Sequence, residues 1–169
     1  SIANYFRLFF TEIIDLKCSK TLYLDLDIFI LDDLTELWKM DLQNQPIAAH
    51  GEDDNSFNSG IMLIDNNKWF ENDIPRKTRQ IIDEGKISLT WWDNDILNHI
   101  FFQNWLDFGE KWNLMPPEFN TSKTEPVIVH FAGSSKPWHK NYNLPYSTRY
   151  KKNFSASRLK YLVNSLISS

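Results

Sequence analysis

Hydrophobic positions recur along this chain with two different periods, which predict helices and strands in alternation. Apolar side chains at helical spacing, together with cap, proline and glycine signals at the ends, predict helices over residues 2–16, 32–38, 75–85 and 155–166. Two further helices are predicted to start near residues 66 and 93. Continuous apolar runs predict buried strands over residues 21–31, 47–49, 60–64 and 127–131. This alternation is typical of the α/β class, and we expect a mixed, mainly parallel sheet.

The run at 21–31 carries two carboxylates, Asp25 and Asp27, inside an otherwise apolar strand. Side chains two residues apart in a strand point to the same side, so we expect the two carboxylates to converge. At about 4 Å they would repel by roughly 4 kcal/mol at an effective dielectric constant near 20, a cost that a cation between them removes. Oxygen ligands suit Mg²⁺ or Mn²⁺ shared with substrate phosphates. The alternative is two unrelated acids, one capping a turn and one solvated.

A second group of polar residues follows the strand at 127–131. His130 closes this strand, and Gly133 and Lys136 lie in the loop after it. A neutral imidazole can join carboxylates on a metal such as Mn²⁺. Glycine lets the backbone approach a ligand closely, and lysine supplies a point charge for phosphate. The alternative is an ordinary turn with a surface lysine.

Composition restricts the class of protein. The chain has 169 residues, 42% of them hydrophobic and 15% aromatic, which indicates a packed globule and not a disordered chain. No apolar run is long enough to span a bilayer. The single cysteine, Cys18, excludes an internal disulfide and fits a reducing compartment, so we expect a cytoplasmic protein.

The net charge of −4 conceals an asymmetry between an acidic body and a basic tail. Residues 126–169 hold seven of the 18 basic residues and none of the 22 acidic ones, together with several aromatic residues. Basic and aromatic residues together suit an anionic membrane surface, so we expect the tail to contact the inner face of the membrane peripherally. The alternative is a helix that packs its aromatic side chains on the core. The acidic body argues against nucleic acid as a partner.

Five segments resemble, in the same order, the motifs of the family 8 retaining glycosyltransferases. The matching residues are 22–27 followed by 33–38, then 57–64, 93–98, 111–113 and 130–138. The resemblance covers about residues 1–140. It is nearest to the bacterial lipopolysaccharide galactosyl- and glucosyltransferases, and glycogenin is a more distant relative.

This resemblance implies a GT-A fold and a retaining transfer of galactose or glucose. The donor would be a UDP-hexose, and the acceptor a glycan of the lipopolysaccharide or lipooligosaccharide core. Asp25, Asp27 and His130 would bind Mn²⁺, or else Mg²⁺. Asp93 and Asn94 would be the catalytic residues, with Asp93 touching the donor sugar. The remaining donor contacts implied by the resemblance are Arg7, Leu26, Asn58, Gly133 and Lys136.

The chain departs from the family pattern at two places. Asp93-Asn94-Asp95 stands where the family usually has Asp-Gln-Asp, and the shorter Asn94 reaches less far toward the anomeric carbon. This favours front-face internal return over a double displacement on that side chain. The strand and helix with which the family begins, and which bind uracil and ribose, have no counterpart before Arg7. We therefore expect a catalytic domain at 1–140 that is incomplete at its N-terminus, followed by a tail at 141–169.

Two other function classes are alternatives to a glycosyltransferase. A phosphohydrolase of the haloacid dehalogenase type also has Asp-x-Asp at a strand end, but the lysine and later acidic pair that it needs have no clear place here. A non-catalytic remnant would fold without binding the whole nucleotide.

Several polar and aromatic residues are expected to have no role in the chemistry. The acidic loop at 52–54 is interpreted as solvated, with an acceptor contact as the alternative. The tryptophans other than Trp138 are expected to pack in the core and not to bind sugar. Trp91 and Trp92 are the exceptions, because they precede Asp93. The histidines without acidic or cysteine partners at ligand spacing are expected to be structural: His50, His99 and His139.

Overall fold

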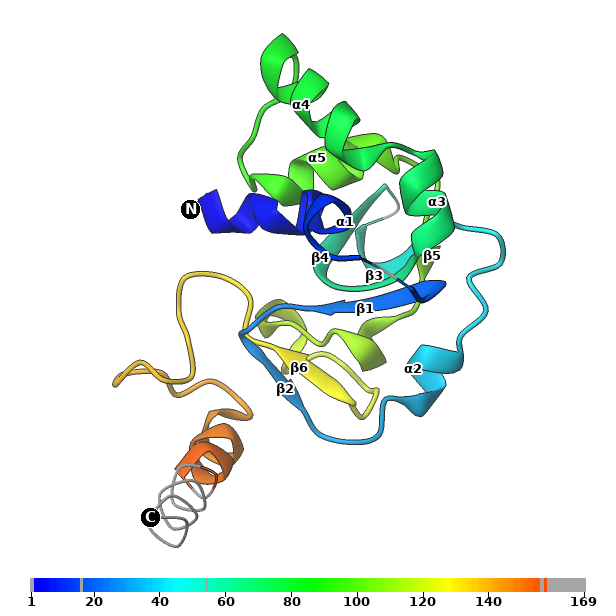
Figure 1. Ribbon diagram of the computed structural model, residues 1–169. Coiled ribbons are helices and arrows are strands. Elements are labelled where there is room, and N and C mark those ends of the chain that lie inside the picture. Colours follow the sequence, from blue (N-terminus) through cyan, green and yellow to red (C-terminus); the bar gives the residue numbers. More distant parts are fainter. Residues whose placement is uncertain (1, 16, 54, 156, 158–169) are drawn as a thin grey trace, which may run out of the picture.

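The computed structural model describes residues 2–15, 17–53, 55–155 and 157, in which helices surround two β-sheets (Figure 1). The larger sheet has the strand order β1-β4-β3-β5, and the smaller one pairs β2 with β6. The strands are β1 (Lys20–Leu24), β2 (Ile28–Ile30), β3 (Ile47–Asp53), β4 (Ser56–Asp65), β5 (Leu106–Asp107) and β6 (Ile128–His130). The α-helices are α1 (Phe10–Ile13), α2 (Thr35–Lys39), α3 (Asn66–Glu71), α4 (Ile74–Glu84) and α5 (Asp93–Ile100). Three 3₁₀ helices are also present, η1 (Ile2–Leu8), η2 (Glu110–Trp112) and η3 (Pro116–Glu118), and residues 147–155 are helical as well.

The predicted mixed α/β architecture is confirmed, and the direction of its strand pairs refines it. β3 pairs with β5 in parallel. The ladders β1–β4, β3–β4 and β2–β6 are antiparallel, although the sequence predicted mainly parallel pairing. A connection as short as that between β3 and β4 permits only an antiparallel hairpin, because parallel neighbours need a long crossover.

The apolar run at 21–31 is not the single strand that the sequence predicted. It forms β1 and β2, which belong to different sheets and are separated by a turn at 25–27. The Asp25 N–H still donates to the carbonyl of Gly60 on β4 over 2.8 Å, whereas Leu26 is fully exposed. The chain then leaves the larger sheet, because β2 finds its hydrogen-bond partners in β6. Hydrophobic periodicity does not reveal such a change of partner.

The two terminal helices also differ from the prediction. The helix expected over 2–16 consists of η1 and the single turn α1, which ends where Ile14 takes an extended conformation. At the other end, residues 147–155 are helical. The helix predicted over 155–166 lies almost entirely outside the described residues. The interior helices agree better, and α4 has the expected proline at its start and a left-handed glycine, Gly85, at its end.

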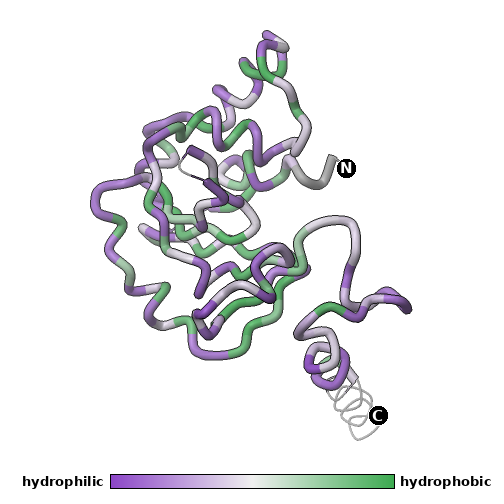
Figure 2. Tube along the Cα trace, turned by 180° about the vertical axis from the view of Figure 1, so that it is seen from behind, coloured by the Kyte–Doolittle hydropathy of each residue, from purple (hydrophilic) through white to green (hydrophobic). Residues whose placement is uncertain are grey.

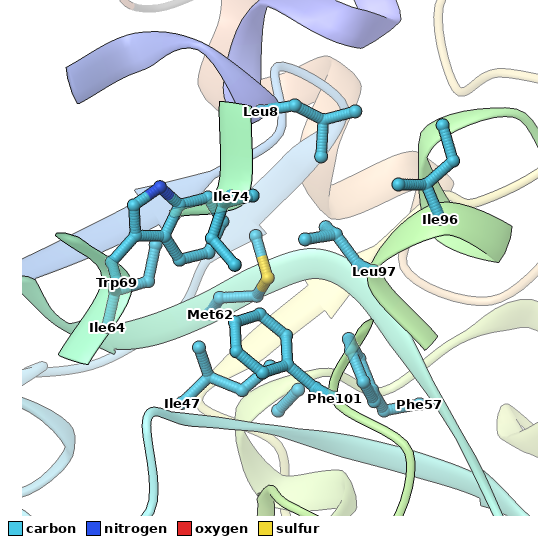
Figure 3. Packing of buried hydrophobic residues seen from close by; sticks show 11 residues of the cluster. Leu8, Ile47, Phe57, Met62, Ile64, Trp69, Ile74, Ile96, Leu97 and Phe101 are labelled. Carbon is cyan, nitrogen blue, oxygen red and sulfur yellow. The ribbon is translucent and has the colours of Figure 1, made fainter. Parts of the chain in front are cut away.

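Hydrophobic clusters cover both faces of the larger sheet. One cluster lies between this sheet and η1, α3, α4 and α5 (Figure 3). The other lies against α2 and the smaller sheet. Met62 and Leu63 are neighbours on β4 but belong to opposite clusters, as the two-residue period of a strand requires. With its middle buried on both faces, β4 is fixed in place and carries its polar residues at 58–60 to the site described below.

A third cluster joins β6 to the start of the C-terminal segment. Tyr142 is buried in it, and Tyr146 and Tyr150 pack against it beside Phe131. Packing of tail aromatics on the core is therefore found for these three tyrosines. Figure 2 shows hydrophobic residues concentrated in the middle of the molecule and hydrophilic residues at its periphery. Within the described residues, no helix is long and apolar enough to cross a bilayer.

Candidate metal and donor-sugar site

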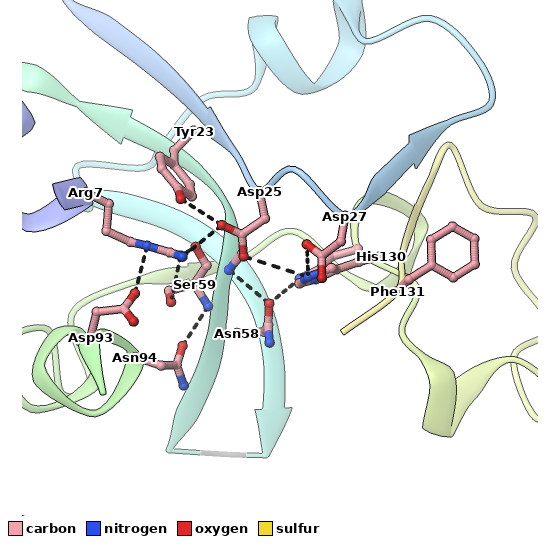
Figure 4. Close-up of polar contacts among 12 residues, drawn as sticks. Arg7, Tyr23, Asp25, Asp27, Asn58, Ser59, Asp93, Asn94, His130 and Phe131 are labelled. Atoms are coloured by element: carbon pink, nitrogen blue, oxygen red, sulfur yellow. Dashed lines mark hydrogen bonds and ion pairs between the residues drawn. The ribbon is translucent and has the colours of Figure 1, made fainter. Parts of the chain in front are cut away.

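Two carboxylates and one imidazole meet where the turn after β1 approaches the end of β6 (Figure 4). Nε2 of His130 lies 3.8 Å from Oδ2 of Asp25 and 3.4 Å from Oδ1 of Asp27. One ligand atom from each of the three side chains lies within 4.8 Å of the others. The expected convergence of the two carboxylates is therefore found, although a turn and not a strand produces it.

Strand register explains why His130 joins the two acids. His130 is the partner of Ile28 in the antiparallel pair of β2 and β6, and Asp27 directly precedes Ile28. The N–H of Phe131 donates to the carbonyl of Asp27 over 2.9 Å, which extends the pairing by one residue into the turn. The imidazole is thus held next to the carboxylates by backbone hydrogen bonds.

Gly60 on β4 forms the wall behind this cluster. A Cβ atom at this position would collide with the His130 ring and would lie 2.9 Å from both Oδ2 of Asp25 and Oδ1 of Asn58. Glycine is therefore required if the three ligand atoms are to approach one another. Two carboxylate oxygens and an imidazole nitrogen form a donor set suited to a divalent cation such as Mn²⁺, so the residues present fit a metal site.

A buried amide supports the histidine from behind. Oδ1 of Asn113 lies 2.9 Å from Nδ1 of His130, and Nδ2 of Asn113 donates to Oδ1 of Asn58 over 3.1 Å. Asn113 is completely buried. The sequence identified Asn113 as part of a motif but gave it no role, because its partner lies 17 residues away on another element.

The orientation of Asp25 is fixed by two donors. Its Oδ1 accepts hydrogen bonds from the hydroxyl of Tyr23 over 2.7 Å and from Nη2 of Arg7 over 2.8 Å. Burial raises the pKa of Tyr23 well above its usual value, so the hydroxyl stays protonated and can donate. With Oδ1 occupied, Oδ2 is the oxygen turned toward His130. Sequence reasoning missed Tyr23, although residues 23 and 25 share one face of a strand.

Arg7 connects the metal end of the site to α5. Its Nε atom lies 2.7 Å from Oδ2 of Asp93, and Nη1 donates to the carbonyl of Ser59 over 2.8 Å. The guanidinium also stacks over the Tyr23 ring, with 4.5 Å from Cζ to the ring centroid. Burial raises the pKa of Asp93 above its usual value, although the charge of Arg7 opposes this. Arg7 and Asp93, both predicted to contact the donor, here contact each other.

Lys136 forms an ion pair with Asp27 and also donates to the carbonyl of Phe131 over 2.8 Å. Burial alone would raise the pKa of Asp27, but the neighbouring His130 and Lys136 side chains outweigh this effect and hold it at about 2. The carboxylate is thus ionised at neutral pH. Gly133 lies in the same loop and has a φ of 91°, a conformation that favours glycine.

Asn94 has a structural partner that the sequence did not predict. Its Oδ1 accepts the N–H of Ser59 over 2.8 Å. One turn later, Asn98 donates to the carbonyl of Phe57 and accepts its N–H, over 2.9 and 2.8 Å. The two asparagines of α5 therefore hold the backbone of β4, and Asn94 uses its oxygen for this purpose.

His50 has acidic partners that sequence spacing did not reveal. It is buried on β3, with Nε2 2.7 Å from Oε1 of Glu118 and Nδ1 3.7 Å from Oδ1 of Asp107. Burial would lower the pKa of His50, but the two carboxylates outweigh it and raise the pKa above the usual value. Glu118 lies 68 residues away in sequence, beyond any local pattern.

Beside Asp93, two tryptophans are exposed at the start of α5. The exposed fraction is 68% for Trp91 and 47% for Trp92, and Trp92 has a φ of 60°. Bulky residues rarely adopt a positive φ, and strain of this kind is concentrated at functional sites.

Comparison with known proteins gives a consistent result. The family model for Glycosyl transferase family 8 matches residues 1–142. General stress protein A of Bacillus subtilis (strain 168) is 30% identical over an alignment of 180 residues, gaps included. The alignment covers 88% of this chain and 63% of that protein. The lipopolysaccharide 1,3-galactosyltransferase of Salmonella typhimurium is 28% identical, with 81% of this chain and 49% of that protein covered.

The fold is also similar to a solved structure. The galactosyltransferase LgtC, crystallised with donor and acceptor sugar analogues, superimposes with a TM-score of 0.78 at 29% identity. The superposition covers 90% of this chain and 66% of that chain. The predicted GT-A fold is confirmed by this likeness. The chain spans about half to two thirds of the length of these three proteins.

Proposed function

The chain belongs to glycosyl transferase family 8, and from this premise we propose that it carries the metal- and diphosphate-binding part of a retaining hexosyltransferase. The donor is a UDP-hexose, with galactose or glucose as the sugar. The observation that carries the proposal is the meeting of Asp25, Asp27 and His130 beside the ammonium group of Lys136. This combination suits an anionic ligand that shares a cation with the protein.

The cation would be Mn²⁺, with Mg²⁺ as the second choice, and Asp25, Asp27 and His130 would hold it. When bound, it supplies positive charge for the diphosphate that leaves as the glycosidic bond breaks. Tyr23 and Arg7 hold Asp25 so that Oδ2 faces the ion. Because Gly60 has no side chain, it leaves room for this arrangement.

Lys136 exchanges its partner when the nucleotide binds. Its ammonium group would leave the carboxylate of Asp27, which would be free to hold the cation, and would donate to a phosphate oxygen. Losing one charged hydrogen bond to phosphate should cost roughly 1.5–3 kcal/mol of binding free energy. Gly133 would allow the loop to lie close to the phosphates. Leu26, fully exposed at the tip of the turn, is free to contact the nucleotide.

Arg7, Asn58 and Asp93 contact the donor sugar in this proposal. Transfer breaks the bond between the anomeric carbon and the phosphate oxygen and forms a bond to the acceptor oxygen on the same face. The acceptor proton passes to the leaving diphosphate. The engagement of Asn94 with Ser59 supports this internal return, because a side chain that holds the backbone is poorly placed as a nucleophile.

The acceptor is a glycan of lipopolysaccharide or lipooligosaccharide type, a proposal supported by the name of the Salmonella relative. The exposed rings of Trp91 and Trp92 offer surfaces for a sugar. Peripheral membrane contact through residues 141–169 stays a prediction, as does the boundary between the catalytic domain at 1–140 and this tail. Liposome sedimentation of the chain with and without residues 141–169 tests the contact, and equal pelleting of the two forms would contradict it.

No contacts to uracil or ribose were predicted from the sequence. Beside β1, the outer strand of the larger sheet, lies a mainly apolar cavity of about 720 Å³ whose lining includes Phe6, Phe10, Ile13 and Tyr23. We propose that the base is bound toward this side of β1.

Calorimetry with UDP, in Mn²⁺ and in EDTA, tests the proposed function. We expect binding that requires Mn²⁺ and that Asp27→Asn abolishes. Asp83→Asn on the exposed face of α4 is the matched control and should bind as the unchanged chain does. Metal-independent binding, or equal binding by both variants, would contradict the proposal.

A further inference from the structure

A metal ion can bind His130 only through a ring nitrogen that carries no proton. Neutral imidazole has one N–H and one lone pair, on either Nδ1 or Nε2. Nε2 is the atom that faces Asp25 and Asp27. The site therefore works only if the proton of the neutral ring is on Nδ1.

The hydrogen-bond network behind the ring determines this choice, starting from a backbone group whose role is unambiguous. The N–H of Gly60 can only donate, and it points at Oδ1 of Asn58 over 3.0 Å. The same oxygen therefore accepts from the amide NH₂ of Asn113 over 3.1 Å. This leaves Oδ1 of Asn113 facing Nδ1 of His130 at 2.9 Å, so Nδ1 must be the donor.

We propose that Asn113, oriented by Asn58, is a positioning residue that holds His130 with its proton on Nδ1 and its Nε2 lone pair toward Asp25 and Asp27. This inference rests on the metal site of the proposed function. It adds that the backbone N–H of Gly60 on β4 selects the tautomer of His130 through the side-chain amides of Asn58 and Asn113. Hydrogen-bonded partners behind metal-bound histidines commonly act in this way.

The placement of Asn113 and His130 suits such a role. Asn113 is completely buried, and His130 is 3% exposed, so solvent does not compete for the bond between them. Asn113 directly precedes Leu114, whose N–H donates to Ile128 and whose carbonyl accepts the N–H of His130. The backbones that carry both side chains are thereby linked, and the amide and ring keep a fixed relation.

The alternative is that Asn113 only satisfies buried polar groups and leaves the ring free to choose either tautomer. Four substitutions separate the two roles. Asn113→Asp keeps an acceptor for Nδ1, and Asn58→Asp keeps an acceptor for both Gly60 and Asn113. Asn113→Leu and Asn58→Leu preserve approximate size and remove these groups.

Long-range ¹H–¹⁵N NMR of the uniformly labelled chain, without metal and over a pH series into the alkaline range, reports which ring nitrogen carries the proton. His130→Gln identifies the His130 signals among the four histidines. We expect the proton of the neutral ring on Nδ1 in the unchanged chain and in both aspartate variants. In both leucine variants we expect a mixture or the Nε2–H form.

Calorimetry with Mn²⁺ alone gives the second readout. Each leucine variant should bind Mn²⁺ about 10–100-fold more weakly, which is the usual cost of losing such a supporting bond. The aspartate variants should bind at least as tightly as the unchanged chain. A merely structural role would make Asn113→Asp, which buries a new charge, as damaging as Asn113→Leu.

A proton on Nε2 of the unchanged chain would overturn the inference by itself, even if Asn113→Leu failed to fold. So would an Nδ1–H form that persists in both leucine variants. The NMR result needs neither metal nor nucleotide. An Nδ1–H ring in a chain that binds no UDP would therefore refute the proposed function and leave the tautomer assignment standing.

Discussion

The two ends of the candidate site differ in how far their polar groups already satisfy one another. The sugar end is the part of the site around Arg7, Asp93 and Asn94. There Arg7 is bound by Asp93, Asp25 and the carbonyl of Ser59, and Asn94 accepts the N–H of Ser59. At the metal end, two carboxylates and an imidazole nitrogen face the same point, and Arg7 pairs with Asp25 and Lys136 with Asp27. In the proposed function, the metal end is therefore prepared for a cation, whereas the sugar end would exchange protein contacts for donor contacts.

This difference predicts unequal responses to mutation. Substitutions at the metal end should reduce ligand binding strongly, because the carboxylate and imidazole atoms there face a common point at which a cation would bind. Substitutions at the sugar end should first reduce folding stability, because the groups there serve one another. Four predictions follow this order, from the largest expected effect to the smallest.

Gly60→Ala should give the largest effect, since a Cβ atom there collides with His130 and crowds Asp25. We expect Mn²⁺ affinity to fall by more than about 100-fold, beyond the usual cost of losing a supporting bond. Overpacking should also cost about 1–3 kcal/mol of stability. Mn²⁺ titration and urea unfolding measure both effects. Gly51→Ala on the neighbouring strand is the control, since its nearest contact is the edge of the Trp105 ring at 3.1 Å.

Lys136→Met separates the diphosphate from the metal. UDP affinity in Mn²⁺ should fall about 10–150-fold, the equivalent of one charged hydrogen bond. Mn²⁺ affinity without nucleotide should not fall, because the ammonium group no longer competes for Asp27. The exposed Lys140→Met is the matched control. A parallel loss of Mn²⁺ binding would contradict the partner exchange proposed for Lys136.

Asn94→Ala tests whether the sugar end behaves as a structural clamp. Removing the acceptor leaves the N–H of Ser59 without its partner, which should cost about 1–3 kcal/mol of unfolding free energy. Asn94→Asp keeps an acceptor at the same place and should recover most of this stability. Urea unfolding measures both variants. An unchanged stability in Asn94→Ala would show that the bond is not formed in solution.

The smallest effect concerns pH and His50. Because its pKa is raised in the folded state, His50 contributes stability fully below its ordinary value of about 6.5 and loses that contribution as pH rises through the folded pKa. The difference in urea midpoint between the chain and His50→Gln should therefore shrink from about pH 6 to pH 9. A difference that grows with pH would contradict the assigned direction.

Sequence patterns predicted the elements well where local chemistry decides them. Pro75 and Gly85 bracket α4 because each fixes a backbone conformation by itself. The two acids of the metal end were found because their spacing brings them together in a strand and also in the observed turn. The break between β1 and β2 was missed, since it depends on which strand each half of the run pairs with.

The supporting residues were also beyond local patterns. Asn113 contacts His130 across 17 residues, and Glu118 contacts His50 across 68. Such pairs are set by the packing of β6 and β3 against the 3₁₀ helices and not by spacing. The sequence pattern and the resemblance both pointed to the ligands, and the structure adds which atoms orient them. Asn94 shows the same limit, because its residue type was known and its partner was not.

The most direct test of the central claim is a crystal structure of the chain with Mn²⁺ and UDP, recorded with anomalous scattering from manganese. The account predicts one anomalous peak in contact with Asp25 Oδ2, an oxygen of Asp27 and Nε2 of His130, with Lys136 moved from Asp27 to a phosphate oxygen. UDP bound with no manganese peak between these three side chains, or a peak at another place, would contradict it.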